Sequence, residues 1–101
     1  MHTKLRLELI IEHMALNRAR TILEDAKLTG YTILPAIAGF GAGRRWRSGD
    51  DLSMAREKSV VVAIGDETKI ETALRELHKL LESQIGVVSV SEVKVLRDER
   101  F

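Results

Sequence analysis

The chain has 101 residues, of which 45% are hydrophobic and 31% are charged, and its formal net charge is +1. This length suits one domain with one core, and the near-balanced charge gives no general attraction to nucleic acid or membranes. The absence of cysteine excludes disulfides, thiolate chemistry and cysteine-ligated metals. The sequence shows neither an export signal nor an apolar run long enough to span a membrane. We expect one cytoplasmic domain over residues 1–101, without membrane insertion.

The first half of the chain predicts a strand, a helix and a second strand. Apolar and polar residues alternate over residues 5–12, as in a half-buried strand. Residues 15–27 carry apolar side chains at steps of three and four, which predicts an amphipathic helix that Thr29-Gly30 should end. Residues 31–40 are rich in strand formers. They contain the only proline, Pro35, so we expect a bent strand at an edge of the sheet.

The second half predicts a long loop followed by a strand, a helix and a strand. Residues 39–58 contain four glycines and clustered charges without a sustained period, which indicates a loop. The apolar run 59–64 predicts a strand buried on both faces. Asp66 is the expected N-cap of a helix with a continuous apolar stripe that ends near Gln84. Residues 87–96 predict the last strand.

The order strand, helix, strand, strand, helix, strand predicts a ferredoxin-like α+β fold. Two right-handed βαβ units give a four-stranded antiparallel sheet with both helices on one face. The apolar pairs Ile33-Leu34 and Val87-Val88 suggest that both sheet faces need burial. We therefore expect the open face to be covered by oligomerisation.

The long loop carries the strongest local signal for ligand binding. Alternating glycines at 39, 41 and 43 permit successive backbone N–H groups to surround an anion, and three of the next four residues are arginines. A solvated loop is an equally weighted alternative. Trp46, the only tryptophan, indicates either an exposed docking anchor or a cation–π contact that orders the loop.

Other activities of this fold find little support in the residues. The strand at 59–64 has no aromatic side chain for stacking RNA bases. His2, His13 and His78 have no nucleophilic partner and match no metal-binding spacing. We expect neither an enzyme nor a metal protein.

Two segments resemble a known family. LTGYT (28–32) followed by GFG (39–41) is similar to the signature that leads into the T-loop of PII signalling proteins, and residues 45–50 resemble the tip of that loop. The order of elements and the ending VKVLR (93–97) also match. The resemblance implies a homotrimer that binds adenine nucleotide in clefts between subunits, with a T-loop at about 41–58 that docks on target proteins.

The resemblance also assigns residues by position. The nucleotide contacts it implies are Thr32, Gly39, Phe40, Gly41, Lys58, Gly86, Val87, Val88 and Arg97. The candidate anion site for bicarbonate is Gly41, Ala42, Gly43 and Arg44, and the candidate docking residues are Arg45, Trp46 and Arg47.

The sequence departs from classical PII proteins in ways that suggest a different effector. The phosphate-cradling B-loop is replaced by the short segment 83–88, in which only Gly86 is retained, and the T-loop has no tyrosine. We expect ADP or AMP, with ATP as a further option, together with bicarbonate. The chain looks most like the carboxysome-associated branch, whose members act on a carboxysome component or a bicarbonate transporter. The alternatives are a PII-like regulator of a bicarbonate transporter that binds another adenine nucleotide, such as cyclic AMP, and a nucleic-acid-binding trimer that uses the arginine loop.

Overall fold

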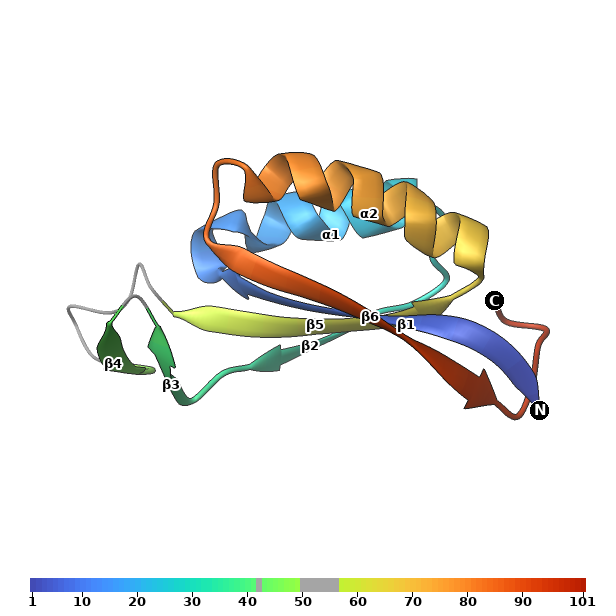
Figure 1. Cartoon of the computed structure of the whole chain (residues 1–101), viewed down its shortest axis with the longest axis horizontal. Helices are drawn as coiled ribbons and strands as arrows, with labels where there is room; N and C mark the ends of the chain where they lie inside the picture. The colour runs from blue at the N-terminus through green and yellow to red at the C-terminus, as the bar shows by residue number, and fades with distance from the viewer. Residues whose placement is uncertain (42, 50–56) are drawn as a thin grey trace.

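The computed structural model describes residues 1–41, 43–49 and 57–101, and its central feature is a four-stranded antiparallel sheet with two helices on one face (Figure 1). The strand order is β2-β5-β1-β6. The elements are β1 (His2–Glu12), a 3₁₀ turn η1 (His13–Ala15), α1 (Leu16–Asp25), β2 (Thr32–Pro35), β3 (Ala38–Gly41), β4 (Arg44–Arg47), β5 (Lys58–Gly65), α2 (Glu67–Leu81) and β6 (Gly86–Val95). This architecture confirms the predicted ferredoxin-like class.

The core lies between the sheet and the two helices. Leu7, Leu9 and Ile11 of β1 alternate toward the helices and are fully buried, as the period-2 pattern predicts. The apolar stripe of α2 meets them through Ile70 and Leu77, which are also fully buried. Neither helix of the described residues is long and apolar enough to cross a membrane.

The end of α1 differs from the prediction. The helix stops at Asp25, and the left-handed residue is Lys27, with a φ of 67°, instead of Gly30. The amide of Leu28 donates to the carbonyl of Leu23, which closes the last turn and places Leu28 in the core. The turn therefore comes before Thr29-Gly30, which leads into β2.

The segment predicted as one bent strand over residues 31–40 is divided in two. β2 pairs with β5 and ends at Pro35, and its position at the edge of the sheet fits the missing N–H of proline. The chain then enters β3, which pairs with β4 in a separate antiparallel hairpin. The described part of the expected loop is therefore a hairpin that projects from one end of the main sheet (Figure 1).

β5 alternates in burial instead of being buried on both faces within one chain. Val61 and Ala63 face the helices and are buried, whereas Val60, Val62 and Ile64 are half-buried on the open face. The prediction that this strand is buried on both faces is wrong for a single copy of the chain.

Candidate functional site

The β3–β4 hairpin holds five of the predicted ligand-contacting residues that the structure describes, and they are Gly39, Phe40, Gly41, Gly43 and Arg44. Gly39 lies opposite Trp46, and Gly41 lies opposite Arg44. A Cβ added to Gly39 would come 2.6 Å from Cζ2 of Trp46, so the indole packs directly on the glycine backbone. The turn uses Gly43 at a φ of 76°, a left-handed conformation that favours glycine. The glycine spacing thus serves the close approach and the turn of a hairpin.

Lys58 connects the hairpin to the main sheet. Its Nζ lies 5.4 Å from the ring centroid of Trp46, in a cation–π arrangement. The same Nζ lies 3.4 Å from the place that a Cβ on Gly41 would occupy. The structure therefore brings Lys58 close to Trp46 and Gly41 of the hairpin, with Trp46 packed on Gly39, and it puts a positive charge beside the glycine backbone.

Trp46 is half-buried, which differs from the exposed anchor that one interpretation of the sequence required. Its indole Nε1 is buried and has no hydrogen-bond partner among the described residues. The cation–π contact with Lys58 is the arrangement that the competing interpretation described. Arg44, Arg45 and Arg47 lie exposed along β4.

Glu57 binds the residues that follow β4, at the base of the hairpin. Its Oε1 accepts hydrogen bonds from the Ser48 hydroxyl at 3.2 Å and from the Gly49 amide at 2.9 Å. The amide of Ser48 also donates to the carbonyl of Ile37 at 2.7 Å. These bonds fix the far end of β4 next to the start of β5. Ala42, the remaining member of the predicted anion site, lies outside the described residues.

The segment Gly86-Val87-Val88 opens β6 at the same end of the sheet. A Cβ on Gly86 would lie 2.8 Å from the carbonyl oxygen of Ile10, so packing alone accounts for glycine at this position. Val88 packs against the core, whereas Val87 is 59% exposed on the open face. A ligand at this turn would therefore meet the Val88 backbone and not its side chain.

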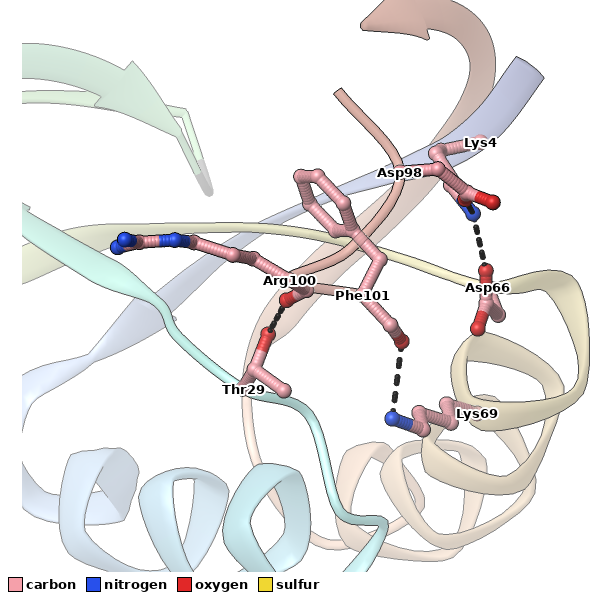
Figure 2. Close-up of polar contacts among 7 residues, drawn as sticks. All are labelled: Lys4, Thr29, Asp66, Lys69, Asp98, Arg100 and Phe101. Carbon is pink, nitrogen blue, oxygen red and sulfur yellow. Dashed lines mark hydrogen bonds and ion pairs between the residues drawn. The ribbon is translucent and has the colours of Figure 1, made fainter. Parts of the chain in front are cut away.

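A second cluster, here called the C-terminal clasp, lies near the two chain ends, at the end of the sheet opposite the hairpin (Figure 1), and its polar contacts are drawn in Figure 2. Its members come from four distant parts of the chain, and they are Lys4, Thr29, Asp66, Lys69, Asp98, Arg100 and Phe101. Lys4 is only 9% exposed, and its Nζ donates to Asp66 at 2.5 Å and also to Asp98. The hydrogen bond to Asp66, followed by that to Asp98, raises the pKa of Lys4, and Lys4 lowers the pKa of Asp98.

The clasp folds the tail back onto the start of α2. Lys69 donates to the Phe101 carbonyl at 2.9 Å, Thr29 donates to the Arg100 carbonyl, and Lys4 lies 5.6 Å from the Phe101 ring centroid. Asp66 is the predicted N-cap of α2, but its carboxylate accepts from Lys4 and makes no capping bond. The clasp fixes the backbone beside Arg97, whose side chain is exposed.

The predicted site residues are therefore divided between the two ends of the sheet. Gly86 lies opposite Ile11 and Lys58 opposite Glu12, whereas Val95, two residues before Arg97, lies opposite His2. At about 3.3 Å per strand residue, the two ends of β6 are roughly 30 Å apart. Thr32 lies between them, at the start of β2. One copy of the chain does not bring Arg97 to the hairpin base.

The fold and this arrangement define a small α+β domain with a glycine-rich hairpin between its second and third sheet strands and a clasped tail. The family model for nitrogen regulatory protein P-II matches residues 4–100, and the chain belongs to this family of signalling proteins. No curated protein matches the sequence.

The fold is similar to that of several solved structures of PII-like proteins. One is CPII, a PII-like protein from Thiomonas intermedia K12 bound to ADP, AMP and bicarbonate, with 24% identity, a TM-score of 0.84 and coverage of 95% of this chain and 91% of that chain. Another CPII structure, bound to ADP and bicarbonate, has 26% identity, a TM-score of 0.80 and the same coverage. A PII-like signalling protein from Thermus thermophilus has 24% identity, a TM-score of 0.73 and coverage of 98% and 95%.

Proposed function

We propose that this chain is a PII-like sensor, working as one domain over residues 1–101, that binds ADP or AMP in clefts between the subunits of a homotrimer. The observation that carries the proposal is the separation of the candidate nucleotide residues. Lys58 and Gly86 lie at one end of the sheet, and Arg97 follows the other end, roughly 30 Å away. A single nucleotide meets both sets only if Arg97 comes from a neighbouring copy.

The chemistry at each end suits one part of the nucleotide. Exposed Arg97 offers a guanidinium to phosphate oxygens, for which bidentate charge-assisted bonds are favourable. Next to the turn of the hairpin, Gly41 leaves backbone accessible beside the Lys58 ammonium. Thr32, Gly39, Phe40, Gly86, Val87 and Val88 complete the proposed cleft. The binding of ADP and AMP by CPII supports this assignment.

Bicarbonate is the proposed second effector, and its proposed site is Gly41, Ala42, Gly43 and Arg44. The positive charge of Lys58 next to Gly41 favours a small anion there. The binding of bicarbonate by CPII, which is 26% identical to this chain, supports the choice of anion. The proposed site spans the turn between β3 and β4, inside the T-loop, so occupancy can change the conformation of that loop.

The proposed output is the docking of the T-loop, at about 41–58, on a target protein. Exposed Arg45 and Arg47 are the proposed contacts, and half-buried Trp46 holds their strand in place through Gly39 and Lys58. We place the protein in the cytoplasm and in the carboxysome-associated branch, with a carboxysome component or a bicarbonate transporter as its target. The chain reports carbon and energy status and performs no chemistry of its own.

The test is isothermal titration of the protein with AMP, ADP, ATP and cyclic AMP, each with and without bicarbonate. We expect binding of ADP or AMP that bicarbonate strengthens. Arg97→Gln should weaken it roughly 10- to 100-fold, as expected for losing a hydrogen bond to a charged group, while Arg18→Gln, a change at an exposed arginine of α1, should leave it intact. No heat with any nucleotide would refute the proposed function, and loss of the trimer in Arg97→Gln would reassign that residue to assembly.

A further inference from the structure

The sheet face that the helices do not cover carries a continuous apolar row. The pairing places Leu34 of β2 opposite Val60 of β5, Val60 opposite Ile10 of β1, and Ile10 opposite Val87 of β6. Residues directly opposite each other in antiparallel strands share a face. The row therefore crosses all four strands, and its two outer members, Leu34 and Val87, are 50% and 59% exposed. Val62 and Ile64 add apolar surface farther along β5.

Two opposite charges lie in the middle of this face. Arg6 and Glu8 of β1 point to the same side as Ile10, because side chains two residues apart share a face of a strand. On β5, Arg6 lies opposite Ile64 and Glu8 opposite Val62, so apolar side chains flank both charges. On β6 their opposite residues are the uncharged Ser91 and Ser89.

The ion pair within one chain uses few of the hydrogen-bond donors and acceptors of these two side chains. Nη2 of Arg6 lies 3.5 Å from Oε1 of Glu8, and each side chain is 35% exposed. A guanidinium has five N–H donors and a carboxylate has about four acceptor positions, so most of this capacity is now left to water. Covering the face would remove that water, and a buried charge that is incompletely paired is strongly destabilising.

We infer that Arg6 of one copy pairs with Glu8 of the next when the open faces of the chain assemble, an inference that rests on the homotrimer of the proposed function. Each copy supplies one positive and one negative group two residues apart, so a closed ring pairs every Arg6 with a neighbouring Glu8 and leaves no charge over. The apolar row supplies the buried area, and the charge pair fixes which copies meet and in what alignment.

Two charge reversals test the inference. Arg6→Glu gives a chain with two negative groups on this face, and Glu8→Arg gives a chain with two positive groups. We expect each variant alone to lose the assembly in light scattering coupled to size exclusion. Mixed by co-expression, the two variants should recover part of it, because two of the three contacts in a mixed trimer join unlike chains and pair opposite charges, and only one joins like chains. Arg75→Glu, on the exposed side of α2, is the control and should assemble as the wild type does.

The mixture separates a bond between copies from the bond within one chain. Reversal of both residues in one chain preserves either kind of pair, but rescue of two single variants by each other requires contact between copies. Single variants that assemble normally, or a mixture that assembles no better than either variant alone, would overturn the inference. If a single variant does not fold alone, the co-expressed pair remains the readout, and recovery of a soluble mixed oligomer supports the inference while its absence refutes it.

The outcome for the wild type keeps this inference distinct from the proposed function. A wild-type protein that is monomeric would remove the homotrimer and the inter-subunit cleft together. A trimeric wild type that binds nucleotide, combined with single variants that do not rescue each other, would leave the proposed function in place and remove only the Arg6–Glu8 pairing.

Discussion

Gly39 and Trp46 face each other across the β3–β4 hairpin, and the indole occupies the space that any side chain at position 39 would fill. The contact explains why the hairpin has a glycine at this position. It also places the indole plane where Lys58 can lie over it. The conformation of the proposed bicarbonate site therefore depends on Gly39, although this residue has no side chain that could contact a ligand.

Gly39→Ala should displace Trp46 and loosen the hairpin while leaving the main sheet intact. The added Cβ would lie 2.6 Å from the ring, and overpacking of this kind typically costs about 1–3 kcal/mol. Hydrogen exchange followed by mass spectrometry should show faster exchange in a peptide that covers residues 38–49. Gly30→Ala is the control, because a Cβ there meets nothing within 4 Å. Equal exchange in both variants would contradict the packing role.

Lys58→Gln and Arg97→Gln should each weaken ADP binding, and a mixture of the two variants should recover part of it. In a cleft built from two copies, some mixed trimers combine an intact Lys58 from one chain with an intact Arg97 from its neighbour. Titration after co-expression should therefore reveal a fraction of sites with wild-type affinity. A mixture that binds no better than the single variants would contradict a cleft that Lys58 and Arg97 of neighbouring copies share.

Acid should open the C-terminal clasp. The folded-state pKa of Asp98 lies below its ordinary value of 3.8, so its stabilising contribution is present above that pH and is lost as the pH falls through the folded pKa. The pKa of Lys4 is raised above 10.5, so its contribution is present below that pH and is lost as the pH rises through the folded pKa. The clasp should be intact between these limits.

Urea denaturation of the wild type and of Asp98→Asn at a series of pH values measures this effect. We expect the variant to be less stable at neutral pH and the two curves to converge as the pH falls below about 4. Glu99→Gln removes a charge at the exposed neighbouring position and should differ less from the wild type at neutral pH. A stability difference for Asp98→Asn that persists well below the folded-state pKa would show that the Asp98 charge is not its cause.

Gly86→Ala should destabilise the protein even without any ligand. The new Cβ would approach the Ile10 carbonyl to 2.8 Å and Leu81 Cδ2 to 2.9 Å. The Leu81 side chain can move, but the backbone carbonyl of Ile10 cannot shift without disturbing β1, so the steric clash remains. A loss of about 1–3 kcal/mol is expected in chemical denaturation, with Gly30→Ala again as the control. An unchanged unfolding midpoint would instead leave ligand contact as the reason for glycine at this position.

The sequence predicts the main sheet well because its signals are local and periodic. The alternation in β1 and the apolar stripe of α2 correspond to single faces of regular elements, and both are confirmed. The strand order follows from chain topology, because βαβ units have one favoured hand. The end of α1 is less well predicted, because Lys27 adopts the left-handed conformation that the sequence analysis expected at Gly30.

The hairpin and the clasp have no comparable local signal. The segment AGFG of β3 has no apolar alternation, and its pairing with RRWR depends on the fit of Trp46 to Gly39. In the clasp, Lys4 meets partners 62 and 94 residues away. A lysine near the start of a strand gives no indication that it will be 9% exposed between two carboxylates. The placement of Arg97 at the end opposite Lys58 could be derived from the strand order.

The single tryptophan of this chain lies in the hairpin and nowhere in the core. Its indole is half-buried against Gly39, with a lysine ammonium over the ring, so the local environment of the fluorophore changes whenever β3 and β4 separate or Lys58 moves to an anion. Emission from selectively excited tryptophan therefore reports on the β3–β4 hairpin alone. The unlabelled protein contains its own optical probe, with which loop motion can be followed in real time as nucleotide or bicarbonate is added.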